Sequence, residues 1–119
     1  MKNFRELKVW EKAHGLTLSI YRITRDFPIQ EQYGLTSQLR RAATSIPTNI
    51  AEGCGRNGDL DFARFLDIAF GSASELEYLI QLCGELELMK SEISYQLQLD
   101  VVEIKRMLSS FLQKLRAVR

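Results

Sequence analysis

Apolar residues recur along the chain at alternating intervals of four and three, which is typical of one face of an α-helix. Four such stripes follow one another, over residues 9–27, 35–50, 62–83 and 93–118. No segment shows the strict alternation of apolar and polar residues that marks a half-buried strand. The pattern therefore predicts an all-α protein, with helices at about residues 6–26, 31–54, 59–88 and 91–117.

The breaks between the stripes are short and carry turn residues. The first follows Phe27, where Pro28 disfavours helical geometry in the residue before it. The second contains the turn dipeptide Asn57-Gly58, after which Asp59 is the predicted N-cap of the next helix. Short connections force consecutive helices to be antiparallel neighbours. We therefore expect one domain, residues 1–119, folded as an antiparallel up-down-up-down four-helix bundle.

Pro47 lies inside the second predicted helix. A proline there removes the hydrogen bond to the Ala43 carbonyl and costs about 3 kcal/mol or more, so we expect a proline-kinked second helix. The hydroxyls of Thr44 and Ser45, or the side chain of Asn49, are the groups that we expect to compensate the freed backbone.

Residues 42–45, just before this proline, are small, and the third helix has a matching small patch made of Ala69, Gly71, Ser72, Ala73 and Ser74. Two interpretations follow. The second helix packs closely on the third, or the kink shapes a functional or subunit-contact surface around Arg41, Asn49 and Glu52. The candidate residues for this structural motif or subunit contact are Ser45, Pro47, Asn49, Glu52, Gly53, Gly71 and Ser72.

The chain has few of the residue types that most often act in catalysis. The 119 residues include one histidine and two cysteines. Glu11 and His14 form a single Glu-x-x-His pair, whereas a di-iron bundle needs two such motifs and two further glutamates. Nor is there a Gly-x-Ser-x-Gly nucleophile elbow. We expect no catalytic residue, no metal site and no cofactor.

The longest stretch without a charged residue is residues 42–51, far shorter than the ~20 apolar residues of a membrane span. No secretory signal is visible at the N-terminus, so we expect a cytoplasmic protein without a membrane partner, whose Cys54 and Cys83 are reduced thiols.

The net charge of +1 conceals a segregated distribution: residues 1–56 carry +4, residues 57–90 carry −5 and residues 91–119 carry +2. The basic residues of the outer segments form a solvated surface, a phosphate-binding patch, or a surface that meets the acidic third helix of another copy. The candidate nucleic-acid-binding residues are Arg40, Arg41, Arg56, Lys105, Arg106, Lys114, Arg116 and Arg119.

Motifs in three parts of the chain carry a resemblance to a known family. The opening motifs are Leu7-x-Val9-Trp10-x-Lys12-Ala13 and Phe27-Pro28-x-x-Glu31-x-Tyr33-Gly34-Leu35. The central motif is Gln38-Leu39-Arg40-Arg41-Ala42-Ala43-x-Ser45-Ile46-Pro47-x-Asn49-Ile50-Ala51-Glu52-Gly53. The third motif is Phe65-Leu66-x-Ile68-Ala69-x-Gly71-Ser72-x-x-Glu75-Leu76. The chain resembles, over roughly residues 4–112, the four-helix-bundle proteins encoded in intervening sequences of bacterial large-subunit ribosomal RNA genes.

That family is similar to the accessory variability protein of diversity-generating retroelements, a homopentameric bundle that binds nucleic acid and a reverse transcriptase. The resemblance implies self-association, with a pentamer favoured, and an association with RNA or DNA. A scaffold that binds a partner protein is the alternative, motivated by apolar and aromatic residues off the core stripes, such as Leu18, Tyr33 and Tyr95.

Overall fold

Four long helices make up almost all of the computed structural model, which describes residues 2–117. They are α1 (Lys8–Thr24), α2 (Leu35–Cys54), α3 (Asp59–Glu85) and α4 (Ser91–Ala117), with short 3₁₀ helices at Phe4–Glu6 and Ile29–Glu31. Residues 2–117 contain no strand. The prediction of an all-α four-helix bundle is confirmed.

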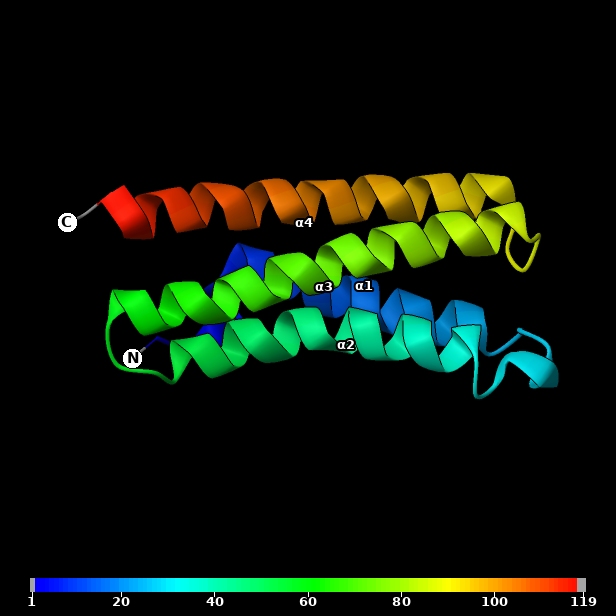
Figure 1. The fold of residues 1–119 in the computed structure, drawn as a ribbon, viewed down its shortest axis with the longest axis horizontal. Coiled ribbons are helices and arrows are strands. Elements are labelled where there is room, and N and C mark those ends of the chain that lie inside the picture. Colours follow the sequence, from blue (N-terminus) through cyan, green and yellow to red (C-terminus); the bar gives the residue numbers. More distant parts are fainter. Residues whose placement is uncertain (1, 118–119) are drawn as a thin grey trace.

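Successive helices run back and forth along a rod of about 48 × 21 × 20 Å (Figure 1). The colours of Figure 1 place both ends of the chain and the α2–α3 turn at one end of the bundle. The α1–α2 and α3–α4 connections lie at the opposite end. Basic residues near the chain ends are therefore brought toward the α2–α3 turn, although they are distant from it in sequence.

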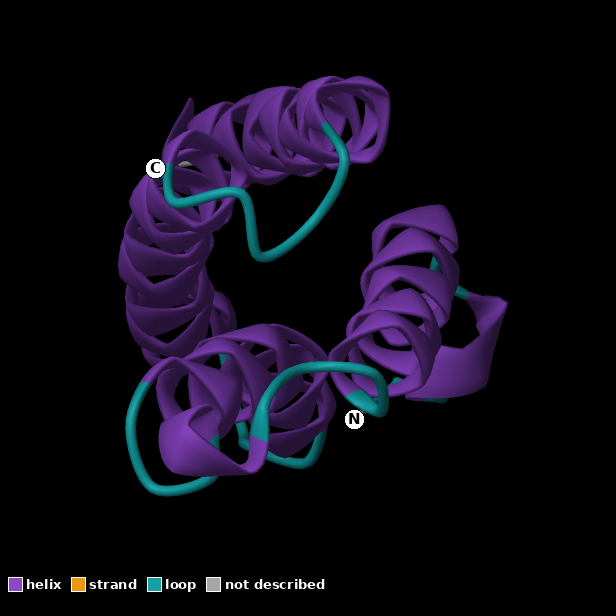
Figure 2. Ribbon diagram, turned by 90° about the vertical axis from the view of Figure 1, so that its right-hand side faces the viewer, coloured by secondary structure: helices purple, strands orange, loops and turns teal. Residues whose placement is uncertain are grey.

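The core lies between the helices, which surround a common centre when viewed along the bundle (Figure 2). α2 and α3 pack extensively on each other, as do α3 and α4, whereas α1 contacts α4 more sparsely. The stripes predicted from the sequence supply the interior. Its largest fully buried side chains are Ile20, Leu39, Ile46, Ile50, Leu66, Leu76, Ile80, Cys83, Val101, Ile104 and Leu108.

The helix ends differ from the sequence expectation at several points. α1 and α2 start later than predicted, because Leu7 and Gly34 have extended or irregular backbone at their N-caps. Gly58, not Asp59, is the N-cap of α3, and its φ of 89° is a value that glycine adopts without the penalty of a Cβ atom. Asp59 instead begins the helix, where its carboxylate complements the helix dipole.

α2 is a continuous helix that contains Pro47, and the proline side chain is buried. The kink at Pro47 stays a prediction. None of the helices in residues 2–117 combines the length and apolar character that a membrane span needs.

Candidate functional site

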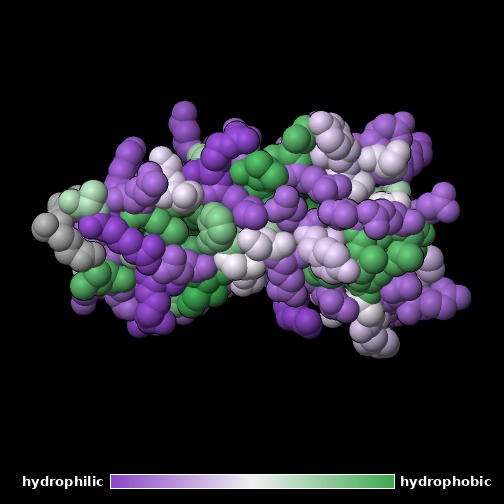
Figure 3. All heavy atoms as spheres, turned by 45° about the horizontal axis from the view of Figure 1, so that its top comes forward, coloured by the Kyte–Doolittle hydropathy of each residue, from purple (hydrophilic) through white to green (hydrophobic). Residues whose placement is uncertain are grey.

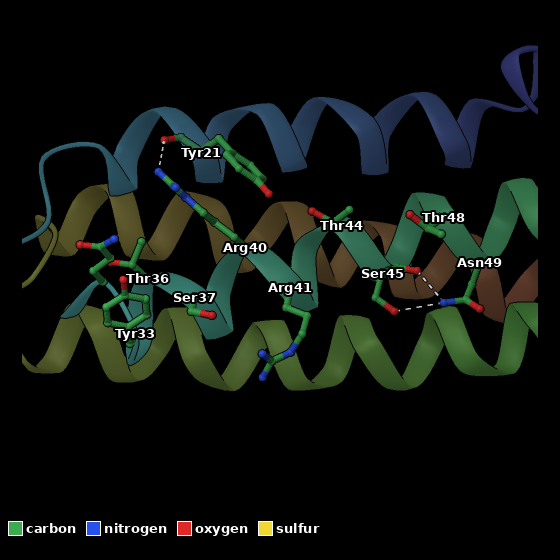
Figure 4. Close-up of a pocket in the computed structure, with 11 residues that line it drawn as sticks. Tyr21, Tyr33, Thr36, Ser37, Arg40, Arg41, Thr44, Ser45, Thr48 and Asn49 are labelled. Atoms are coloured by element: carbon green, nitrogen blue, oxygen red, sulfur yellow. Dashed lines mark hydrogen bonds between the residues drawn. The ribbon is translucent and has the colours of Figure 1, made fainter.

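A small, half-buried polar network joins α2 to α3. The Oγ atoms of Ser45 on α2 and Ser72 on α3 are 2.8 Å apart and share a hydrogen bond. One turn along α2, the Asn49 side chain donates to the Ser45 carbonyl at 2.8 Å and to the Ser45 Oγ at 3.0 Å (Figure 4). Three of the predicted motif residues thus form one network, which supports close packing of the two helices.

The carbonyl that Pro47 leaves without its usual partner is served from another helix. Thr17 of α1 donates its hydroxyl to the Ala43 carbonyl at 3.0 Å, and to the Ala13 carbonyl at 2.9 Å. Thr17, and not Thr44, Ser45 or Asn49, therefore serves the Ala43 carbonyl, whereas Asn49 donates to the nearby Ser45 carbonyl. The Thr44 Oγ1 is itself buried and has no hydrogen-bond partner among the described residues. Thr17 was not predicted, although a hydroxyl beside the core stripe of the first helix is a signal that could have identified it.

The two glycines of the predicted motif have different surroundings. A Cβ atom on Gly53 would lie 2.8 Å from Phe62 Cδ1 and 3.0 Å from Phe65 Cβ, so the missing side chain allows α3 to approach α2. A Cβ atom on Gly71 would meet nothing within 4 Å. Glu52 is exposed and pairs with Arg56 at 3.7 Å. Gly53 therefore belongs to the helix contact, whereas Gly71 lies on the outside of α3.

Several of the predicted phosphate-binding residues are engaged within the chain. Lys105 Nζ lies 3.0 Å from Glu77 Oε1, and Arg116 pairs with Asp67. Both pairs link α4 to the acidic α3. Part of the charge segregation seen in the sequence is thus neutralised within one chain.

Other predicted cations have different roles. Arg40 donates through Nε to Thr24 Oγ1 at 2.9 Å, and its guanidinium lies 4.6 Å from the centre of the Tyr21 ring. Arg41, Arg106 and Lys114 are exposed and take part in none of the ion pairs within residues 2–117. Arg119 lies outside the described residues.

Figure 4 shows a shallow groove along the outer face of α2. Tyr21 borders it from α1, and Tyr33 borders it from the α1–α2 connection. Its hydroxyl and amide groups come mainly from α2. Two arginines, Arg40 and Arg41, line the groove, and none of its lining residues is acidic. The sequence identifies both arginines as candidate nucleic-acid-binding residues, but it does not predict the groove.

The two cysteines and the histidine lie in different environments. Burial raises the pKa of the Cys83 thiol to about 11, and burial also raises that of Cys54. His14 is exposed and stacks on Trp10, with ring centres 4.9 Å apart. Within residues 2–117, no three His, Cys, Asp or Glu side chains lie together as metal ligands do.

The sequence and the fold match known proteins. A family model described as 23S rRNA-intervening sequence protein matches residues 5–110. Among solved structures, the chain is similar to a protein of unknown function from the S23 ribosomal protein family of Bacteroides thetaiotaomicron. The two share 28% identity and a TM-score of 0.79, over 88% of this chain and 98% of that one. No curated protein matches the sequence. These matches confirm the resemblance to the intervening-sequence family that the motifs indicate.

Proposed function

The chain belongs to the 23S rRNA-intervening sequence protein family, and from this premise we propose that it is a non-enzymatic, homo-oligomeric bundle that associates with RNA. By family resemblance a pentamer is the favoured assembly and the protein is bacterial, and the cytoplasm is the proposed location. The single observation that carries the RNA association is that three of the predicted phosphate-binding residues, Arg41, Arg106 and Lys114, are exposed and take part in none of the ion pairs found in residues 2–117.

Such cations suit phosphate groups because nothing within the subunit neutralises them. Each phosphate contact releases condensed counterions, so RNA affinity is expected to fall steeply with salt. Arg56, Lys105 and Arg116 are secondary contributors, since binding a phosphate would compete with their existing ion pairs. In an oligomer the exposed cations of several subunits share one surface, where their fields add.

Self-association is supported by a second apolar stripe on α4. Tyr95, Leu99 and Val102 are spaced by four and three residues, so they share a helix face that differs from the core stripe. Tyr95 is 65% exposed and Leu99 is 46% exposed. Figure 3 shows hydrophobic side chains reaching the surface in separate patches between hydrophilic ones. Burial of this stripe against another copy would remove it from water.

RNA binding is tested by titrating the purified full chain with mixed single- and double-stranded RNA while salt is raised. We expect binding at low ionic strength. The logarithm of the association constant should fall linearly with the logarithm of the salt concentration. Replacing Arg106 and Lys114 by glutamine should weaken binding and flatten this slope. Lys90→Gln, at the α3–α4 turn, is the matched control. Absence of salt-dependent binding would overturn the proposal.

Subunit number is tested by light scattering, with and without RNA. Leu99→Glu places a charge on the exposed stripe and is expected to shift the protein toward monomer. Leu86→Glu is the control, since Leu86 is 55% exposed in the α3–α4 turn. A wild-type monomer at all concentrations would contradict self-association. Capture of one partner protein in stoichiometric amounts, without RNA binding, would instead favour the scaffold function.

A further inference from the structure

The groove on the outer face of α2 has the chemistry of a single-stranded nucleic-acid site. We infer that it binds a short segment of single-stranded RNA, with Tyr33 stacking on a base and Arg41 contacting the backbone. This site rests on the proposed association with RNA and specifies where and how the strand is held. Its parts are a positive lining, exposed aromatic rings and a row of hydroxyl groups.

The charge of the groove favours an anion. The chain has 15 acidic residues, yet the lining contains none and includes two arginines. Arg40 is held by Thr24 and by the Tyr21 ring, so it supplies a fixed positive charge. Arg41 is exposed and outside the described ion pairs, which leaves its guanidinium available for a phosphate.

Two tyrosines supply aromatic surface at one end of the groove. Tyr33 is 91% exposed, which is unusual for a large ring because so little of it is buried against the protein. Tyr21 is 41% exposed, and the Arg40 guanidinium 4.6 Å from its ring centre fixes its position. Proteins that bind single strands combine such rings, on which unpaired bases stack, with a positive groove that follows the backbone.

Hydroxyl and amide groups continue the groove along α2. Ser37, Thr44, Thr48 and Asn49 lie along it over about 18 Å, given the rise of ~1.5 Å per helical residue. The Thr44 Oγ1 is buried without a partner among the described residues, so a donor or acceptor brought by a ligand would satisfy it. RNA has a 2′-hydroxyl that both donates and accepts, and DNA lacks it. This row of polar groups therefore favours RNA over DNA.

A labelled oligouridine, measured by fluorescence anisotropy against the full chain, tests the site. Tyr33→Ala is expected to weaken binding about tenfold, the effect of losing one base stack. Its matched control is Tyr78→Ala, because Tyr78 is 60% exposed on α3, away from the groove, and should change affinity less than about twofold. Circular dichroism establishes that both variants fold, as these exposed rings do not support the core.

Two further variants examine the polar contacts. Arg41→Gln should weaken binding. It should also reduce the slope of log affinity against log salt concentration by about one, the effect of losing one phosphate contact. Thr44→Val keeps the side-chain shape, and it should reduce the preference for oligouridine over the same DNA oligomer. If this variant prefers RNA over DNA as strongly as the wild type does, the row of hydroxyl groups does not take part in RNA recognition.

The possible results distinguish failure of the groove as the binding site from failure of RNA association itself. If wild-type protein binds RNA and both Tyr33→Ala and Arg41→Gln bind equally well, the groove is not the site, although RNA association stands. If wild-type protein binds no RNA at low salt, RNA association itself fails. Equal displacement of the RNA by an oligoglutamate of the same charge would show a site for polyanions in general, and would overturn recognition of RNA.

Discussion

Thr17 of α1 donates a hydrogen bond to the Ala43 carbonyl of α2 at 3.0 Å, and this carbonyl is the one that Pro47 cannot reach with an N–H group. The same hydroxyl lies 2.9 Å from the Ala13 carbonyl of its own helix, so the two carbonyls share one donor. A proline inside α2 is thus tolerated partly because a neighbouring helix supplies the missing partner. The contact also ties α1 to α2 at this point.

Thr17→Val should destabilise the fold by about 1 kcal/mol, because it leaves a partly buried carbonyl without a donor. Urea denaturation provides the measurement. Thr48→Val is the matched control, since Thr48 is exposed and its hydroxyl makes none of the hydrogen bonds found in residues 2–117. Equal losses of stability in the two variants would show that the Thr17 contact contributes nothing specific.

Pro47→Ala should relieve the dependence on Thr17, since alanine restores the backbone N–H that can reach the Ala43 carbonyl. In this background, Thr17→Val is expected to cost less than half of what it costs in the wild type, which a double-mutant cycle measures. Additive effects would contradict the coupling between the two residues.

Light scattering on Pro47→Ala distinguishes the two interpretations of the proline. A change in stability with the same subunit number indicates a packing role. A changed subunit number shows that this part of α2 helps to build the subunit contact.

The pattern of apolar positions was enough to predict the four helices, since burying one stripe of each helix is the main requirement of the fold. The partner of a polar side chain depends on how two helices are rotated and shifted against each other. For that reason the Thr17–Ala43 contact and the Lys105–Glu77 and Arg116–Asp67 pairs could not be predicted.

The same reason limits what the sequence can say about the candidate site. The arginines at positions 40 and 41 are adjacent in sequence, yet one is fixed on Tyr21 and the other is exposed. Tyr33 comes from a connection whose path depends on the packing of α1 and α2. The groove therefore became visible only when these separate segments were placed together.

The buried Cys83 thiol should make the stability of the protein depend on pH in the alkaline range. Burial raises its pKa in the folded protein from 9.0 to about 11, with a smaller contribution from Glu31. Between these values the unfolded chain loses the thiol proton and the folded chain keeps it, so stability should fall as pH rises from about 9 to 11. The fall measured for Cys83→Ala by denaturation should be smaller, because one such thiol is gone. Identical pH profiles would contradict this origin.

The contact between α2 and α3 predicts opposite effects for alanine at two glycines. In Gly53→Ala, the new methyl group would lie 2.8 Å from the Phe62 ring and 3.0 Å from Phe65 Cβ, so the ring or the helices must shift. Such overpacking costs about 1–3 kcal/mol. In Gly71→Ala the methyl group has open space, and alanine favours the helix by about 0.5–1 kcal/mol. Denaturation of both variants checks the prediction, and comparable stabilisation of the two would mean that helix propensity, rather than close packing, governs both positions.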